Sequence, residues 1–168
     1  MSERHMTRLA RVAAVAICAA GLLSPALGHA LAAEATRASY REAVEPICKA
    51  DTEANERILA GVKGEVRAGM LRPAAARFAR AALALERTIG ELRTVTPPPA
   101  DRSRLSRWLG TVSVEAGLFE RVAAKLRAGQ KAEAARMVVK LTSNANHANN
   151  QVIAFEFEYC RFEPARFT

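Results

Sequence analysis

Apolar residues recur at intervals of three and four along most of the chain after residue 35, which is the spacing of one buried face of an α-helix. The clearest stripe steps from Phe78 through Leu85 to Leu92. No segment shows the period of two that is expected of a half-buried strand. The pattern therefore predicts four helices, at about residues 35–68, 73–94, 101–128 and 131–162.

Prolines and glycines mark the boundaries of these helices. Pro97–Pro99 cannot continue a helix and separates the second from the third, whereas Gly129 ends the third. Asp101 or Ser103 is expected to cap the start of the third helix. Pro46 lies inside the first predicted segment, so that helix is expected either to kink or to begin there.

Four helices joined by short links favour an all-α fold, an antiparallel up-down-up-down four-helix bundle. In that topology the start of the first helix and the end of the fourth lie at one end, where Cys48 and Cys160 fall. We expect a disulfide between them, worth roughly 4–5 kcal/mol in the chain-entropy model because it closes a long loop. The alternative, a reactive dithiol, usually has a C-x-x-C spacing, which these cysteines lack.

The first part of the chain is typical of a secretory signal. Three arginines precede an uncharged apolar run at residues 12–23, and Ala30–Ala32 offers a small-x-small cleavage motif. The run is shorter than the roughly 20 residues that a permanent membrane span needs. We expect a cleavable signal peptide at residues 1–32 and a single domain at residues 33–168, secreted or otherwise extracytoplasmic, without a permanent transmembrane helix.

A few polar residues fall on faces that should point into the bundle. Asp51 interrupts the apolar stripe of the first helix, with Asn55 one turn later, and Glu115 and Glu156 lie beside the stripes of the third and fourth helices. A buried carboxylate without a partner costs several kcal/mol. Two interpretations stay open: a structural network in which these groups satisfy one another, or a pocket that binds a cation or a small basic ligand.

One face of the second predicted helix is basic. Arg77, Arg80 and Arg87 share it and form the best candidate for an anion-binding surface. Without the predicted signal peptide the chain has 22 basic and 16 acidic residues, a net charge of +6, which favours an anionic envelope polymer or another envelope protein as partner. No specific nucleic acid is expected. The alternative is a solvated face whose salt bridges contribute little.

Signatures of catalysis and cofactor binding are missing from the sequence. There is no C-x-x-C-H, glycine-rich phosphate loop or G-x-S-x-G, and the predicted domain has one histidine, His147, where a di-metal bundle needs two Glu-x-x-His pairs. We expect no enzyme, no cofactor and no metal site. The chain is interpreted as an exported, non-enzymatic binding or interaction module of the cell envelope or extracellular space. The alternative is a small-ligand or metal-ion carrier that uses the inward polar cluster.

Short motifs are spread over nearly the whole predicted domain. They are Tyr40-x-x-x-Val44-x-x-Ile47-Cys48, Leu92-x-x-Val95 before Pro97-Pro98, Trp108-Leu109, and Asn149 with Ala154, Tyr159 and Cys160. Together they resemble a family of uncharacterised exported helical-bundle proteins of actinobacteria. Members of that family often carry glycines near the final cysteine, where this chain has Phe157 and Arg161. The resemblance implies a terminal disulfide and brings no activity with it.

Overall fold

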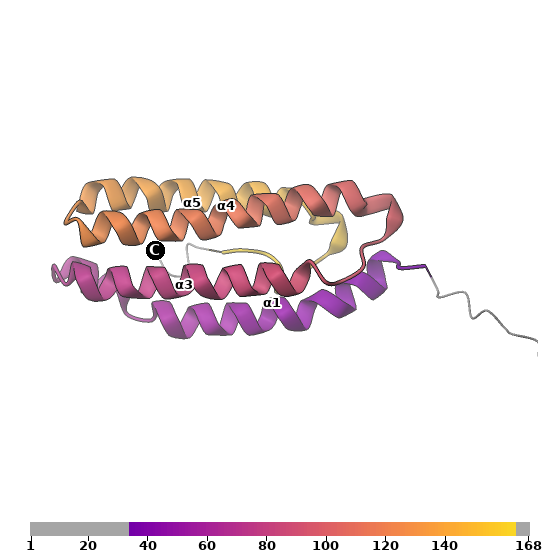
Figure 1. Ribbon diagram of the computed structural model, residues 1–168, viewed down its shortest axis with the longest axis horizontal. Helices are drawn as coiled ribbons and strands as arrows, with labels where there is room; N and C mark the ends of the chain where they lie inside the picture. Colours follow the sequence, from indigo (N-terminus) through magenta and orange to yellow (C-terminus); the bar gives the residue numbers. More distant parts are fainter. Residues whose placement is uncertain (1–33, 164–168) are drawn as a thin grey trace, which may run out of the picture. The chain divides into compact units, whose positions relative to one another are not determined.

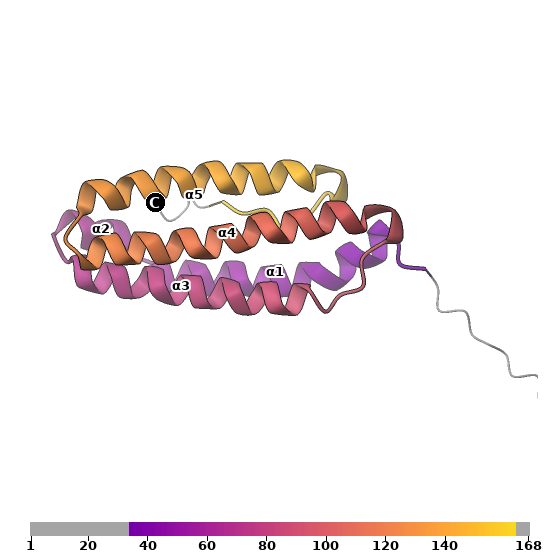
Figure 2. The same ribbon diagram turned by 45° about the horizontal axis from the view of Figure 1, so that its top comes forward.

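The computed structural model describes residues 34–163, and every regular element within them is a helix. Successive long helices alternate in direction and lie side by side (Figures 1 and 2). The all-α fold class is therefore confirmed for this part of the chain, whereas the predicted signal peptide, residues 1–32, lies outside it. The long helices are α1 (Arg37–Leu59), α3 (Leu71–Leu92), α4 (Arg102–Arg127) and α5 (Lys131–Gln151), and the short elements are α2 (Val62–Arg67), η1 (Pro99–Asp101) and η2 (Ile153–Phe155).

None of the helices in this described part has the length and hydropathy that are needed to cross a membrane. Their apolar faces pack on one another instead, most extensively α3 on α4, α4 on α5 and α1 on α3. Trp108 is completely buried in this core, and Leu92 and Leu105 belong to the same buried cluster. The helices thus bury one stripe each, as the sequence pattern predicts.

The first predicted helix, residues 35–68, is two helices in the structure. α1 ends at Leu59 and α2 begins at Val62, because Gly61 adopts a left-handed backbone with φ of 80° that interrupts the helical hydrogen bonds. The chain continues helically through Pro46, whose nitrogen has no hydrogen to donate to the preceding turn. Glycine, and not proline, is therefore the residue that divides this segment.

The starts of α1 and α4 are tied together by an ion pair. α1 begins with a capping box, in which Thr36 and Ser39 exchange backbone-to-side-chain hydrogen bonds of 3.1 and 3.0 Å. Asp101 occupies the N-cap position of α4, but its side chain does not cap the helix. It accepts hydrogen bonds from Nε and Nη2 of Arg37 at 2.6 and 2.8 Å, and these bonds lower the pKa of Asp101.

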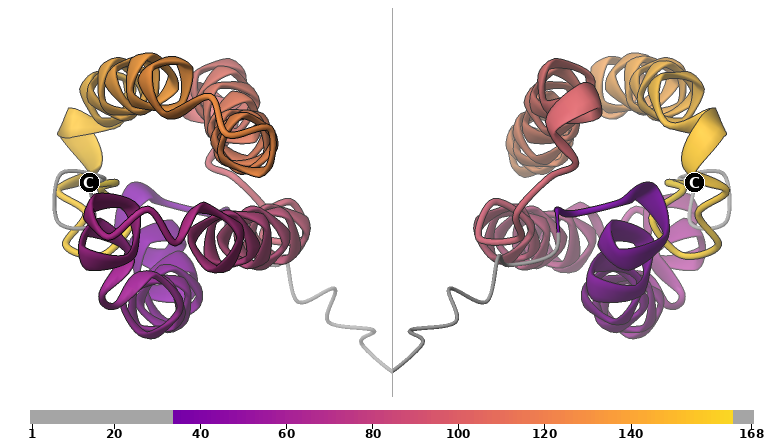
Figure 3. Two further views of the ribbon diagram at one scale, coloured as in Figure 1. Left: turned by 90° about the vertical axis from the view of Figure 1, so that its left-hand side faces the viewer. Right: turned by 90° about the vertical axis from the view of Figure 1, so that its right-hand side faces the viewer.

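The fourth predicted helix, residues 131–162, is too long, because α5 ends at Gln151. After η2 the chain turns at Glu156, which has a left-handed backbone with φ of 52°. Residues 156–163, here called the C-terminal segment, then run back along the bundle between α1 and α5 (Figures 1 and 3). Phe155 and Phe157 are both buried, although two residues apart on a helix would point to different faces.

The predicted disulfide between Cys48 and Cys160 is present, with the two Cα atoms 5.0 Å apart. Its setting differs from the expected one, because Cys48 lies in the middle of α1 and Cys160 in the C-terminal segment, not at the end of a helix. The carboxylate of Glu45 adds a second attachment, since it accepts hydrogen bonds from the backbone amides of Glu158 and Tyr159 at 2.6 and 2.8 Å.

The C-terminal segment is attached to α5 as well. The side chain of Asn149 donates to the carbonyl of Phe162 and accepts from its amide, both at 2.9 Å, as a neighbouring backbone would. The rings of Phe157 and Phe162 pack on Trp108, with centroid distances of 5.7 and 6.4 Å. The segment is thus part of the core.

Candidate functional site

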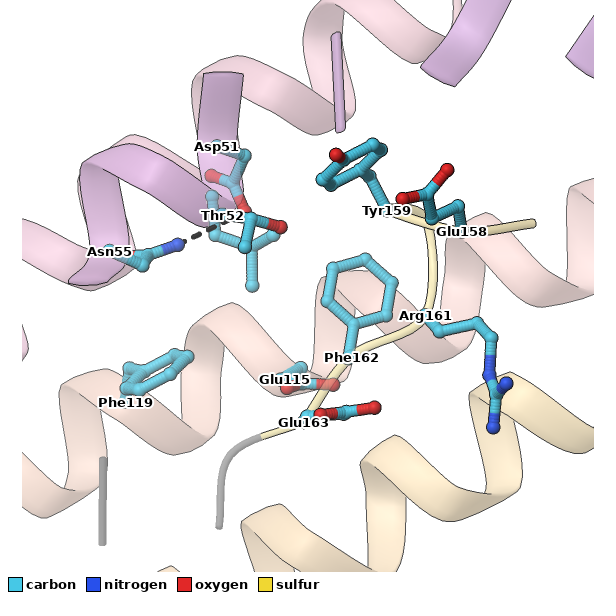
Figure 4. A pocket seen from close by; sticks show the side chains of 11 residues that line it. Asp51, Thr52, Asn55, Glu115, Phe119, Glu158, Tyr159, Arg161, Phe162 and Glu163 are labelled. Atoms are coloured by element: carbon cyan, nitrogen blue, oxygen red, sulfur yellow. Dashed lines mark hydrogen bonds between the residues drawn. The ribbon is translucent and has the colours of Figure 1, made fainter. Parts of the chain in front are cut away.

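A cavity of about 150 Å³ lies where the C-terminal segment passes α1, α3 and α4 (Figure 4). α1 contributes Asp51, Thr52 and Asn55 to its wall, and α4 contributes Glu115 and Phe119. The rest of the wall is Leu85 of α3 and five residues of the C-terminal segment, Glu158, Tyr159, Arg161, Phe162 and Glu163.

Asp51 is held in place by two hydrogen-bond donors. Asn55, one turn further along α1, donates from Nδ2 to Asp51 Oδ2 at 3.0 Å, and the hydroxyl of Thr88 on α3 lies 3.0 Å from Asp51 Oδ1. Asp51 is only 6% exposed. Burial raises its pKa, while the two hydrogen bonds act in the opposite direction and Glu91 adds a smaller upward effect.

Glu115 is more deeply buried and less well supported. Its side chain is 2% exposed, and Asn144 Nδ2 lies 3.5 Å from its Oε2 while making a shorter bond of 3.0 Å to the carbonyl of Thr111. Burial raises the pKa of Glu115 to about 8, with a further contribution from the charge of Asp51 and a partial offset from Asn144. The carboxyl is therefore mostly protonated at neutral pH.

One hydrogen-bond acceptor of the cavity residues has no donor. Asn55 Oδ1 is buried and has no hydrogen-bond partner, because the other end of that amide is committed to Asp51. No lysine or arginine in residues 34–163 forms an ion pair with Asp51 or Glu115. Figure 4 shows the guanidinium of Arg161 pointing away from Asp51. A buried acceptor without a donor costs about 1–3 kcal/mol, so the site is suited to a ligand that donates hydrogen bonds.

Three of the four residues of the predicted polar cluster come together in this cavity, namely Asp51, Asn55 and Glu115. Glu156 does not join them, and its inclusion was wrong. Its side chain is 82% exposed and lies 3.4 Å from Arg41, because the chain has already left the helix at that point and the expected inward face no longer exists.

The predicted arginine face is divided in its contacts. Arg77 donates from Nε to Glu65 at 2.8 Å and from Nη1 to the carbonyl of Ile58 at 3.0 Å, so it joins α3 to the ends of α1 and α2. Arg80 and Arg87 are exposed, and neither forms a hydrogen bond or ion pair with another described residue. Only these two are available to a partner.

Several residues that line the cavity or contact its carboxylates were not identified as site residues from the sequence. Thr88 was missed, although a polar residue between Leu85 and Ile89 on an apolar stripe was a usable signal. Asn144 belongs to the amide-rich run at residues 142–151, whose side chains bond to α4 and to the C-terminal segment. Phe162 gave no signal, because its place depends on where α5 ends.

The cavity wall is mixed in its chemistry. Within residues 34–163 no three His, Cys, Asp or Glu side chains are grouped so that they could hold a metal ion. The lining of the cavity combines Asp51, Asn55 and Glu115 with the aromatic residues Phe119, Tyr159 and Phe162 (Figure 4). No protein-family model, curated protein or solved structure matches this chain.

Proposed function

We propose that this protein is a binding module whose cavity takes a small protonated amine between Asp51, Asn55 and Glu115. The observation that carries the proposal is the unpartnered, buried Asn55 Oδ1 beside two buried carboxylates that have no cation. An ammonium group supplies three hydrogen-bond donors and one positive charge, whereas no lysine or arginine of residues 34–163 is paired with Asp51 or Glu115. Binding would satisfy the acceptor and compensate the carboxylates at the same time.

The size and the remaining wall restrict the ligand further. A cavity of about 150 Å³ is the size that accommodates benzene, so the ligand inside it has about six non-hydrogen atoms. Phe119, Tyr159 and Phe162 offer ring faces and edges to its carbon atoms and attract its charge. A short alkylamine or diamine fits this description better than Ca²⁺, which takes six to eight oxygen ligands.

We place this binding outside the cytoplasm, in the cell envelope or the extracellular space. The predicted signal peptide and the Cys48–Cys160 disulfide both support that location, because disulfides persist in oxidising compartments. The role that follows is capture or carriage of the amine and not catalysis. This keeps the interpretation of a non-enzymatic exported module and assigns it a class of ligand.

The test is calorimetric titration with butylamine, 1,4-diaminobutane and butanol at pH 8. Asp51→Asn removes a charge and keeps one of the two oxygens to which Asn55 and Thr88 donate. Glu156→Gln removes an exposed charge outside the cavity and is the control. We expect the amines to bind, butanol not to bind, and Asp51→Asn to weaken binding by about tenfold or more. Equal binding of butanol, or an equal effect of Glu156→Gln, would overturn the proposal.

A second candidate function rests on Arg80 and Arg87, which are exposed on α3 without a partner in the described part of the chain. They would contact an anionic envelope polymer or an acidic face of another envelope protein. Retention on heparin at low salt, lost at high salt and reduced in Arg80→Glu/Arg87→Glu, is the expected result. Absence of retention at low salt would exclude this function.

A further inference from the structure

A second hollow lies at the end of the bundle where α2 faces α4 and α5. It is a groove of about 340 Å³ that shares no residue with the amine cavity. Figure 3 (left) looks at the end of the bundle where α2 lies. α2 leaves α1 at Gly61 and packs on α3, so its apolar side forms one wall while α4 and α5 form the other.

The floor of the groove is apolar. Phe78, Val122 and Leu126 form it, each with 3% or less of its surface exposed, and Val62 of α2 closes one side. On α5, Ala134 and Ala135 have side chains too small to fill the remaining space. By comparison with a cavity of about 150 Å³ that holds benzene, this volume accommodates about twelve carbon atoms.

The rim of the groove is basic. Lys63 and Arg67 of α2 and Lys131 of α5 are exposed along it, and none of them forms an ion pair with another described residue. No carboxylate lines the groove. The acidic residues next in sequence, Glu65 and Glu133, are paired elsewhere, with Arg77 and Arg136. An apolar floor therefore meets an uncompensated positive rim.

We propose that this groove binds a free fatty-acid carboxylate, with the acyl chain on the Phe78 floor and the carboxylate among Lys63, Arg67 and Lys131. The groove matches both parts of such a molecule, because the acyl chain is removed from water along the apolar floor while the carboxylate stays at the basic rim. The volume of the groove is sufficient for one acyl chain and not for the face of a bilayer, so a single fatty acid fits it better than a membrane surface does.

The experiment uses monomeric dodecanoate, dodecanol and dodecyltrimethylammonium, titrated below their aggregation concentrations and followed by calorimetry. Dodecanoate is expected to bind at least about tenfold more tightly than dodecanol, and the cationic amphiphile more weakly than either. A proposal based on the floor alone predicts equal binding of the three. Equal affinities would therefore refute the role of the basic rim.

Two sets of variants test floor and rim separately. Ala135→Trp fills the groove from its exposed side and should weaken dodecanoate and dodecanol alike by about tenfold or more. Lys63→Glu/Arg67→Glu/Lys131→Glu should weaken dodecanoate binding by a similar factor and leave dodecanol binding within about twofold. Arg107→Glu, at an exposed position of α4 outside the groove, is the charge control.

Unaltered dodecanoate binding in Ala135→Trp would overturn the assignment of the groove, and so would an equal loss in Arg107→Glu. If Ala135→Trp does not fold, Ala135→Leu is measured in its place. Binding to vesicles of phosphatidylglycerol without binding of monomeric dodecanoate would identify a membrane surface as the partner instead. Because Asp51 and Glu115 lie in the other cavity, failure of either proposal leaves the other standing.

Discussion

Replacing Glu115 with glutamine removes the most strongly perturbed acid in the described part of the chain. Burial raises the pKa of Glu115 from 4.5 to about 8. Between these two pH values the folded protein holds a proton that the unfolded chain has released. The free energy of unfolding therefore falls as the pH rises through this window, because stability decreases wherever the folded state binds more protons.

The magnitude follows from the same two values. At about 1.4 kcal/mol per pH unit, the interval corresponds to a loss of about 5 kcal/mol that is complete near pH 8 and absent below pH 4.5. Glutamine has nearly the same shape, does not titrate, and keeps an oxygen that Asn144 can contact. The variant should therefore match the wild-type protein at low pH and exceed its stability by about 5 kcal/mol at pH 8 and above.

The assay is urea denaturation of both proteins at intervals from pH 4.5 to pH 9. The difference between the two free energies of unfolding isolates Glu115, because the other titrating groups contribute to both curves. Glu156→Gln, which removes an exposed carboxylate, should give a difference that changes by less than about 1 kcal/mol. A difference for Glu115→Gln that stays as flat as this control would refute the reasoning.

Ligand binding provides an independent test of the raised pKa of Glu115. A cation in the cavity favours ionised Glu115, so amine affinity should rise from pH 6 to pH 8 and binding should release protons. Calorimetry in buffers of different ionisation enthalpy measures that release directly. Proton uptake on binding would contradict the proposed place of the ammonium group.

Three further predictions concern the backbone and its attachments. Replacing Cys48 and Cys160 with alanine should lower the free energy of unfolding by about 3–5 kcal/mol, because the disulfide closes a loop of 112 residues. Guanidinium titrations measure this difference, and equal stability with and without the disulfide would contradict the prediction. Asn149→Ala removes both hydrogen bonds to the backbone of Phe162 and should lower the free energy of unfolding by about 1–3 kcal/mol. The backbone amide of Phe162 should then exchange its hydrogen faster, and unchanged exchange would count against the attachment. Gly61→Ala should destabilise the fold by about 1 kcal/mol, because Gly61 has a positive φ. Gly64→Ala should stabilise the fold by about 0.5–1 kcal/mol, because Gly64 lies inside α2 with open space around it. Shifts of the melting temperature in the same direction for both variants would be inconsistent with this geometry.

The helices were predictable because each buries one stripe, and a stripe repeats every three or four residues whatever its partner is. The same property explains the error at the end of the chain. Val152, Phe155 and Tyr159 keep helical spacing, yet the α-helix ends at Gln151. Their side chains are buried or half-buried from the short 3-10 helix η2 and the non-helical backbone on either side of it. Spacing records that a residue is buried and does not record which backbone buries it.

The site was predictable to the extent that it interrupts a stripe. Asp51 and Glu115 stand out because an acidic residue on an apolar face needs a reason, and the structure places both in one cavity. Their proximity to Tyr159 and Phe162 could not be predicted, because it depends on the C-terminal segment running back along the bundle. That return is set by one residue in a left-handed conformation, Glu156, a residue type that gives no turn signal.

Net charge is a poor guide to the ligand proposed for this cavity, for a related reason. The chain carries a net charge of +8, which favours anionic partners, whereas the amine cavity is lined by four carboxylates and one guanidinium. The sign of the net charge describes the solvent-exposed surface and the basic groove at α2. It does not describe a cavity whose field is set by a few groups within a short distance, in surroundings of low dielectric constant.

The attachments of the C-terminal segment connect stability to binding. The disulfide to α1, the carboxylate of Glu45 and the side chain of Asn149 hold a segment that supplies five of the eleven cavity residues. Loosening any attachment exposes Asp51 and Glu115 to water, which lowers the cost of their charges and also removes the reason for them to prefer an ammonium group over solvent. The bonds that close the bundle therefore also create the selectivity proposed for its cavity.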